Sequence, residues 1–356
     1  MKTYDVTALG ELLIDFTENG ISEQGNPILE ANPGGAPCNV LSMLVKLGHK
    51  GAFIGKIGAD MFGDQLACAI REVGIDTTGL KIDEQVHTTL AFVHTLEGGE
   101  REFSFYRNPG ADMMLSEHDL DETLIKDSKF FHFGSLSMTD EVCRQATRKA
   151  IEIAEQSGAL LSYDPNLREP LWKSLEDAKE QIFYGMEHCN VLKISDNEIQ
   201  WLTGKEDYDA GILLLMERYH IPLILLSMGK NGSRAYTNRF RVEKPAFVTE
   251  DTIETTGAGD VFCACILHYI LEHGWHEYNE KELGEMLEFA NPISDMEKSY
   301  ISMYSQYIEK YNNITCYTKT GADDSSFIVI VAFDLKYKNV DTAAPGLDCF
   351  YVKTNE

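Results

Sequence analysis

Glu254-Thr255-Thr256-Gly257-Ala258-Gly259-Asp260 is the stretch around which the chain is organised, because this glycine-rich turn runs directly into the apolar segment 261–267. Gly257 and Gly259 carry no Cβ, so the backbone can approach a ligand closely. The free amides at the start of a helix, together with the helix dipole, form an anion site. An ordinary glycine-rich loop that caps a core helix would look similar, and short motifs of this kind also match by chance.

Asp260 follows the turn and falls in the first turn of the expected helix. A carboxylate beside a phosphate-sized anion site is badly suited to binding the anion itself. It is well placed to take a proton from a hydroxyl group that attacks the anion, which is the arrangement needed for phosphoryl transfer. The turn therefore predicts a phosphotransferase with Asp260 as its general base.

Composition limits the classes of partner. The chain has 356 residues, of which 44% are hydrophobic, and a formal net charge of −26. Such a surface repels nucleic acid and anionic membranes, so we expect a small-molecule ligand. The start of the sequence has no long apolar h-region, and no stretch of about 18 apolar residues occurs. We therefore expect no signal peptide, no membrane span and a cytoplasmic location. The eight cysteines form no CxxC pair, so we interpret them as reduced core residues.

Apolar strands alternate with helices along most of the chain, which predicts an α/β fold with a mainly parallel sheet and helices on both faces. The expected strands are 4–16, 52–57, 129–133, 159–163, 190–194 and 222–226, with short strands within 233–248. The expected helices are 39–47, 60–73, 139–157, 174–188, one that opens at 195–198, 207–220, one after Asp260, and 281–290.

Residues 88–106 interrupt this alternation. Two β-rich segments there flank Leu96-Glu97-Gly98-Gly99-Glu100, which indicates a hairpin. We expect this hairpin to belong to a small β-sheet lid that stands off the main body, with residues 17–33 supplying its other strands. Its exposed face could pair two subunits, so a homodimer through the lid is predicted.

Polar residues at the ends of the expected strands suggest a ligand site at that edge of the sheet. Asp15 ends the first expected strand, and Gly34, Gly35 and Asn39 lie at a turn before a helix. Such groups suit a polyol, although a plain turn and helix start is an equally good interpretation. Likewise, Ser195 and Glu198 fit a helix capping box as well as a ligand site. Neither a Walker A motif nor GxGxxG occurs.

Together these separated motifs resemble the PfkB, or ribokinase-like, carbohydrate kinase family over roughly residues 4–291. The segments 10–16 and 33–39 are most similar to bacterial fructokinases, and 256–260 resembles the family's C-terminal signature. The resemblance implies a doubly wound α/β fold with a small β-sheet lid. It also implies transfer of the ATP γ-phosphate to a sugar hydroxyl with Mg²⁺, most simply fructose to fructose 6-phosphate.

The resemblance also implies roles for single residues. Asp260 matches the catalytic base, and Glu198 matches the magnesium-organising motif, where it would act through water. The anion hole matches Gly257, Ala258 and Gly259. The sugar contacts match Asp15, Gly34, Gly35 and Asn39, with Tyr106, Arg107 and Arg168 at the far end of the sugar. The nucleotide side matches Lys193, Ser195, Ser227, Gly229 and Gly232, with Asn291 as an adenine-side candidate.

Two departures from the family pattern stand out. Glu254 occupies a position where the family often carries Asp near a monovalent-cation site, so K⁺ is only a possible cofactor. After Asn291 the family pattern stops, and residues 292–356 resemble a fragment of another α+β module, similar to domains of bacterial surface proteins. Expected strands in this tail are 327–336 and 349–353.

Other functions remain open at this point. Arg107 and Arg168 could pair with a substrate carboxylate, as a 2-keto-3-deoxygluconate kinase would require. Another sugar kinase fits the same motifs. A non-catalytic sugar- or nucleotide-binding protein is the alternative from a different class, because the tail replaces the segment that borders adenine in the family.

Overall fold

The computed structural model describes residues 2–95, 101–246, 257–296, 314–320 and 327–333. By its internal contacts the chain divides into residues 1–302 and residues 303–356, and each unit is described by itself. Within the described ranges, no helix has both the length and the apolar character needed to cross a membrane.

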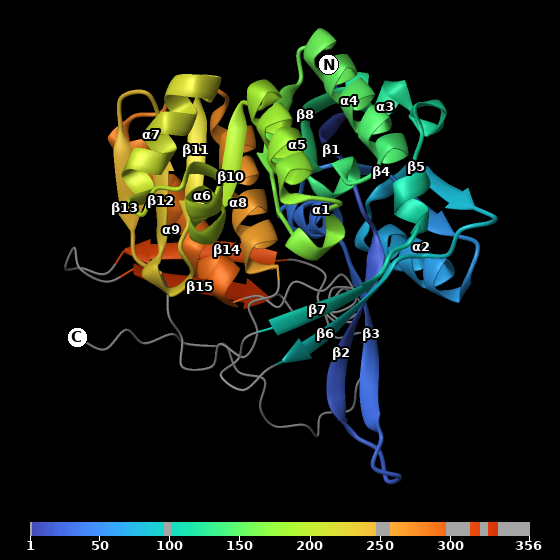
Figure 1. The fold of residues 1–356 in the computed structure, drawn as a ribbon. Helices are drawn as coiled ribbons and strands as arrows, with labels where there is room; N and C mark the ends of the chain where they lie inside the picture. Colours follow the sequence, from blue (N-terminus) through green and yellow to red (C-terminus); the bar gives the residue numbers. More distant parts are fainter. Residues whose placement is uncertain (1, 96–100, 247–256, 297–313, 321–326, 334–356) are drawn as a thin grey trace. The chain divides into compact units, whose positions relative to one another are not determined.

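A nine-stranded sheet forms the centre of the first unit, with the order β13-β12-β11-β10-β9-β8-β1-β4-β5 (Figure 1). Neighbouring strands pair in parallel except β11 with β12 and β12 with β13, so the predicted mainly parallel sheet is confirmed. The strands are β1 (Tyr4–Leu9), β4 (Gly51–Gly58), β5 (Asp76–Asp83), β8 (Ser128–Gly134), β9 (Leu160–Asp164), β10 (Val191–Ser195), β11 (Leu223–Ser227), β12 (Ser233–Tyr236) and β13 (Arg241–Lys244).

Helices cover both faces of this sheet, with α5, α6 and α7 on one side and α8 and α9 on the other (Figure 1). Almost the whole first half of α8 is buried, which explains its continuous apolar sequence. The helices are α1 (Ala36–Lys46), α2 (Met61–Val73), α3 (Glu122–Lys126), α4 (Glu141–Gln156), α5 (Leu175–His188), α6 (Asp196–Thr203), α7 (Tyr208–Tyr219), α8 (Ala258–His273) and α9 (Glu280–Met296).

The predicted first strand, 4–16, is wrong as a single element. β1 ends at Leu9, and a second strand, β2 (Leu13–Ile21), begins after a short break. In the break, Glu11 is buried and its carboxylate accepts a hydrogen bond from the backbone N–H of Ala36 at 3.0 Å, at the start of α1. The apolar run hides this change of direction, because both strands are buried where they meet. Asp15 therefore lies in a different sheet from β1.

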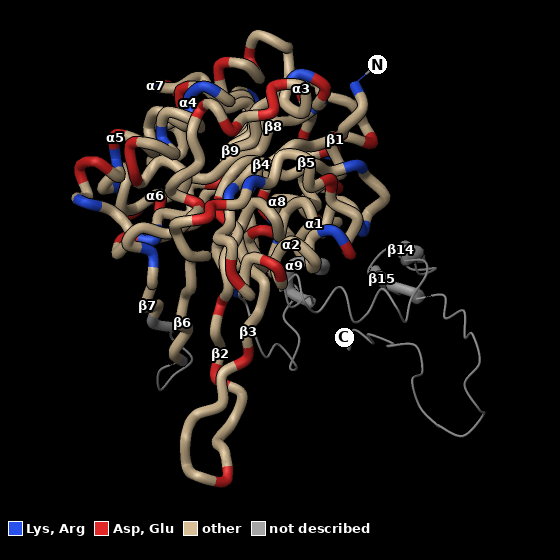
Figure 2. The backbone as a smooth tube through the Cα atoms, turned by 90° about the vertical axis from the view of Figure 1, so that its right-hand side faces the viewer, with Lys and Arg blue, Asp and Glu red and all other residues tan. Residues whose placement is uncertain are grey.

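That different sheet has the strand order β3-β2-β6-β7 and contains β3 (Pro27–Gly34), β6 (Leu90–Thr95) and β7 (Arg101–Tyr106). Strand β2 pairs with β3 in antiparallel and with β6 in parallel. Its strands extend away from the nine-stranded sheet (Figures 1 and 2). The predicted small sheet, with strands from both 17–33 and 88–106, is confirmed.

Neither β5 nor α3 was predicted from the sequence. β5 is an edge strand with mostly half-buried and exposed residues, including Asp76, Thr77, Thr78 and Asp83. An edge strand packs on only one side, so it needs no apolar run and gives a weak sequence signal. The short helix α3 gives an even weaker one.

The second unit contains the strand pair β14 (Ile314–Thr320) and β15 (Phe327–Phe333), which are antiparallel. β15 confirms most of the predicted strand 327–336, whereas β14 was not predicted. The predicted strand 349–353 lies outside the described residues. In the first unit, α9 continues to Met296 and so passes the expected helix end at 290; the assignment of 292–356 to a separate module stays a prediction.

Candidate active site

Helix α8 begins at the glycine-rich turn, as predicted. Gly257 is its N-cap residue and has φ 81°, a left-handed conformation that favours glycine. No side chain in the described part of the chain caps this helix start, which leaves the amides of its first turn available to an anion there. Gly257, Ala258 and Gly259 form this helix start, and their role as an anion hole stays a prediction.

Asp260 lies in the first turn of α8 and is only 7% exposed. Its Oδ2 accepts a hydrogen bond of 2.8 Å from Nδ2 of Asn39, which lies near the start of α1. The structure thus brings together a predicted sugar contact and the predicted base. Oδ1 of Asn39 is buried and has no hydrogen-bond partner in the part of the chain that the structure describes. A buried acceptor of this kind is suited to a ligand hydroxyl.

The charge state of Asp260 is set by opposing effects. Burial raises the pKa of its carboxyl above the usual value, because it disfavours the charged form. The hydrogen bond from Asn39 and the positive charges of Lys193 and Arg168 oppose this rise. The result is a carboxylate that holds a proton more readily than an exposed aspartate does, as a general base requires.

Lys193 and Asp164 form a buried ion pair next to the turn, with Nζ 2.9 Å from Oδ2. They project from the neighbouring strands β10 and β9. Although burial favours the neutral amine, the carboxylates of Asp164 and Glu198 raise the pKa of Lys193, so the ammonium is retained. A Cβ on Gly259 would lie 2.8 Å from this Nζ. The second glycine of the turn therefore makes room for a cation at the start of α8.

Ser195 and Glu198 form the capping box at the start of α6 that the sequence also allowed. The Ser195 backbone N–H and hydroxyl donate to Glu198 Oε2 at 2.9 and 2.8 Å, and the backbone N–H of Leu167 donates to Oε1 at 3.0 Å. Glu198 thereby joins the loops after β9 and β10. The structural role is present, and it keeps the carboxylate at the edge of the sheet.

A cavity of about 330 Å³ opens beside these loops. It contains two of the predicted nucleotide-side residues, the predicted magnesium-organising residue and one predicted sugar contact. Its lining residues are Asn166, Leu167, Arg168, Glu169, Lys193, Ser195, Asn197, Glu198 and Trp201. A second cavity of similar volume, about 340 Å³, lies around Trp275 and Tyr278 and contains none of the predicted site residues.

The remaining predicted sugar contacts lie where β2, β3 and α1 meet. A Cβ on Gly34 would lie 2.2 Å from Oδ2 of Asp15, so the carboxylate lies directly over this glycine. Gly35 is the N-cap of α1 with φ 124°, and a Cβ there would lie 2.4 Å from the carbonyl oxygen of Glu11. Gly35 therefore has to be glycine, whereas a side chain at position 34 would have to displace the Asp15 carboxylate. The two glycines form the short turn between β3, which pairs with the strand of Asp15, and α1, which carries Asn39.

Arg168 and Tyr106 differ in their surroundings. Arg168 adopts a left-handed conformation with φ 45°, and its guanidinium lies over the ring of Phe103 in β7 at 5.7 Å from the centroid. It also acts on the pKa of Asp260, so it lies between the small sheet and the base. Tyr106 is 67% exposed at the end of β7 and packs edge-on against Phe92.

Arg107 has a different position from the one expected of a sugar contact. It is buried and pairs with Asp112, with Nη2 2.7 Å from Oδ2. Its other donors reach the Thr139 hydroxyl at 2.7 Å and the Leu136 carbonyl at 3.0 Å. These protein groups already occupy the donors of the Arg107 guanidinium, which the family resemblance placed at the far end of the sugar. The interpretation of Arg107 as a partner of a substrate carboxylate therefore has no support in this geometry.

On the predicted nucleotide side, Ser227 ends β11, and Gly229 and Gly232 form the turn before β12. Gly232 has φ 90°, and a Cβ there would lie 2.1 Å from the carbonyl oxygen of Lys244, so this turn requires glycine. Asn291 in α9 accepts a hydrogen bond from the Ser233 hydroxyl at 2.7 Å and donates to the Pro245 carbonyl at 2.9 Å. These bonds hold the β12–β13 region to α9. Glu254 lies outside the described residues.

Only Arg168 was selected from the polar segment 164–168, which directly follows the expected strand 159–163. The structure adds Asp164, which pairs with Lys193, and Asn166, whose side chain lowers the pKa of Asp260. Their signal was their position directly after an apolar strand. His132 behind them, hydrogen-bonded to Ser162 at 3.0 Å, gave no signal because it reads as a core residue of β8.

Comparisons with known proteins agree with this geometry. The family model described as pfkB family carbohydrate kinase matches residues 4–297. A probable fructokinase-2 of Arabidopsis thaliana is 44% identical over 289 residues, which cover 80% of this chain and 87% of that protein. Among solved structures, the fructokinase with bound ATP from Xylella fastidiosa is 27% identical with a TM-score of 0.76, covering 84% of this chain and 94% of that one. A fructokinase double mutant from Vibrio cholerae O395, bound to fructose, ADP and a potassium ion, is 26% identical with a TM-score of 0.75, covering 83% and 93%.

Proposed function

Because this chain belongs to the pfkB family of carbohydrate kinases, we propose that it is an ATP-dependent fructokinase that converts fructose to fructose 6-phosphate. The observation that carries the proposal is the buried Asp260 carboxylate, which lies at the start of α8 and is hydrogen-bonded to Asn39. At this point the proposed base, Asp260, lies at the anion site formed by the start of α8. Asn39 adds a buried oxygen, Oδ1, that can accept a hydrogen bond from a hydroxyl group.

The chemistry begins with the sugar. Asp15 and Oδ1 of Asn39 accept hydrogen bonds from sugar hydroxyls. The oxygen of the reacting sugar hydroxyl attacks the γ-phosphorus of ATP while Asp260 takes the proton of that hydroxyl. The bond from that phosphorus to the bridging oxygen breaks, and ADP leaves with the electron pair. The amides of Gly257, Ala258 and Gly259 stabilise the charge on the transferred group.

Lys193 and two carboxylates serve the phosphates. The Lys193 ammonium lies against Gly259 and so next to the anion hole. No hydrogen-bond donor in the described part of the chain reaches Oδ1 of Asp164, so this buried oxygen can accept from a metal-bound water, as can Glu198 at the cavity edge. These residues fit a hydrated Mg²⁺, which neutralises phosphate charge when bound.

The small sheet serves as a lid that excludes water from the transferred phosphate. Arg168 links it to the site, because its guanidinium lies over Phe103 of β7. Ile21, Ile28 and Leu29 are exposed on β2 and β3, and the lid is proposed to pair two subunits through such apolar surface. Sedimentation of the purified chain as a monomer would contradict this dimer.

We also propose that a potassium ion activates the enzyme. The Vibrio cholerae fructokinase carries a potassium ion, and Glu254 is the carboxylate that the family resemblance associates with such a site. A faster turnover in potassium chloride than in a salt of a bulky organic cation, lost in Glu254→Gln, would support it.

ADP formation from ATP and Mg²⁺ with a panel of sugars tests the function. The panel should contain fructose, 2-keto-3-deoxygluconate and ribose. We expect fructose to give the highest kcat/KM. A preference for the keto acid would favour the alternative kinase, although the buried pairing of Arg107 with Asp112 argues against it. No turnover with any sugar, together with retained sugar binding, would favour the non-catalytic binding protein.

A further inference from the structure

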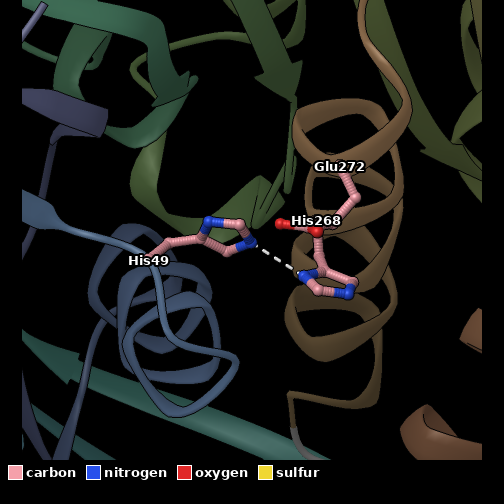
Figure 3. A group of neighbouring side chains, drawn as sticks. All are labelled: His49, His268 and Glu272. Carbon is pink, nitrogen blue, oxygen red and sulfur yellow. Dashed lines mark hydrogen bonds between the residues drawn. The ribbon is translucent and has the colours of Figure 1, made fainter.

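Three side chains with metal-binding groups meet near the C-terminal end of α8, at the other end of the helix from Asp260. They are His49, His268 and Glu272 (Figure 3). His49 lies in the segment between α1 and β4, and His268 and Glu272 are four residues apart on one face of α8. Their potential ligand atoms all lie within 4.8 Å of one another. We propose that this cluster binds a divalent transition-metal ion of the Zn²⁺ class, at a site separate from the active site.

The ligand set suits such an ion. Two imidazoles and one carboxylate, with water in the fourth position, are a common donor set for zinc. Nε2 of His49 lies 2.7 Å from Nδ1 of His268. In a tetrahedral zinc site the ligand atoms are about 3.4 Å apart, given Zn–N bonds of about 2.0–2.1 Å. The two rings therefore need to separate by well under an ångström, and the exposed Glu272 can adjust its rotamer freely.

Asp5 lies beside one of the two rings. Its Oδ2 lies 3.7 Å from Nδ1 of His49. Asp5 is itself held by Lys129 at 2.8 Å and by the backbone N–H of Lys50 at 2.9 Å. A carboxylate facing Nδ1 favours the proton on that nitrogen and leaves the Nε2 lone pair free to bind a metal. This Nε2 is the atom that faces His268 and Glu272.

The other ring is also prepared for a metal. Phe289 of α9 stacks against His268 with ring centroids 5.2 Å apart. Burial lowers the pKa of His268 to about 4 and also lowers the pKa of His49. Both rings are therefore uncharged at neutral pH, and a metal ion does not have to displace an extra proton from an imidazolium. With the proton of His49 on Nδ1, the hydrogen bond between the rings requires Nδ1–H of His268 as its donor. A metal ion bound at that nitrogen requires the His268 proton on Nε2 instead.

The site joins α8 to the segment that follows α1. The opposite ends of the same two helices carry Asp260 and Asn39, which are hydrogen-bonded to each other. A bound ion would therefore stabilise the pairing of α1 with α8. The alternative is a plain hydrogen bond between two packed histidines, which predicts no metal binding at this position.

The test uses the full-length protein after treatment with a chelator and in excess Mg²⁺, so that oxygen-lined sites are occupied. We expect Zn²⁺ to bind with one equivalent by calorimetry and to raise Tm, since a ligand specific for the folded state stabilises it. Co²⁺ should give the visible absorption bands of a tetrahedral site. His268→Gln should lower the Zn²⁺ affinity at least tenfold and abolish the rise in Tm.

His118→Gln is the matched control, because His118 is exposed and outside the cluster; its Zn²⁺ affinity and rise in Tm should equal those of the wild type. Glu272→Gln is a second variant. Because the Glu272 side chain is exposed, we expect the variant to fold normally and to bind Zn²⁺ more weakly than the wild type. Equal Zn²⁺ affinity in His268→Gln, Glu272→Gln and the wild type would overturn the proposal, as would the absence of binding to the wild type.

Discussion

Nδ2 of Asn39 donates a hydrogen bond of 2.8 Å to Oδ2 of Asp260, although 221 residues separate the two in the chain. This bond joins the starts of α1 and α8. It places a residue suited to sugar recognition against the proposed base, and it favours the charged form of that base. Both consequences can be measured.

The pH dependence of the reaction tests the second consequence. Asp260 can act as a base only in its ionised form. We therefore expect kcat/KM for fructose to fall as the pH drops through the pKa of Asp260, which burial raises above the usual aspartate range. Asn39→Ala removes a hydrogen bond to the charged form and should move this acidic limb to higher pH. Asn19→Ala, an exposed asparagine in β2, should leave the limb in place. An unmoved limb in Asn39→Ala would count against Asp260 as the titrating group.

A variant of Asp15 tests the proposed contacts to the sugar. Asp15→Ala should raise the KM for fructose about fivefold to 150-fold, which corresponds to about 1–3 kcal/mol, because sugar hydroxyls lose an acceptor. The KM for ATP should not change. Glu18→Ala, on the same strand but half exposed, is the control and should change neither value. A raised KM for ATP in Asp15→Ala would mean that the two halves of the site are wrongly assigned.

Gly259 tests the nucleotide side. A Cβ there would lie 2.8 Å from Nζ of Lys193, so Gly259→Ala should displace the ammonium from Asp164 and from the start of α8. We expect a higher KM for ATP and an unchanged affinity for fructose. Gly284→Ala is the matched control in α9, where the nearest atom would lie 3.4 Å away, and should leave both constants unchanged.

Arg107 should matter for stability and not for specificity. Arg107→Met leaves Asp112 buried without its partner, which typically costs about 3–5 kcal/mol. Tm should fall sharply, and any folded fraction should keep the wild-type KM for fructose. Arg239→Met removes an exposed ion pair with Glu277 and should hardly change Tm. A selective loss of sugar affinity in Arg107→Met would restore Arg107 as a substrate contact.

Much of the fold could be predicted because buried parallel strands and amphipathic helices leave strong patterns. The failures have local causes. The apolar run 4–16 hides a break, because Glu11 turns inward to the start of α1 and no pattern marks that turn. The edge strand β5 lacks an apolar run because it packs on one side only.

The candidate site could be predicted in part. The sequence predicts that Gly34, Gly35 and Gly259 belong to turns at a ligand site. The structure shows which atoms a Cβ would meet at each of these positions. The pairing of Asn39 with Asp260 and of Lys193 with Asp164 depends on long-range packing, so no local pattern contains it. Arg107 shows the opposite error, because a residue next to a site can face inward and hold the fold together.

The most direct measurement is the kcat of Asp260→Asn with fructose and ATP, together with the fructose dissociation constant of the same variant. The substitution removes the proton acceptor and keeps a group that can hydrogen-bond to Asn39. We predict that kcat falls at least about 10²-fold, as for loss of a general base, while fructose binds nearly as tightly as to the wild type. A variant with near-normal kcat would contradict Asp260 as the base, and with it the proposed mechanism.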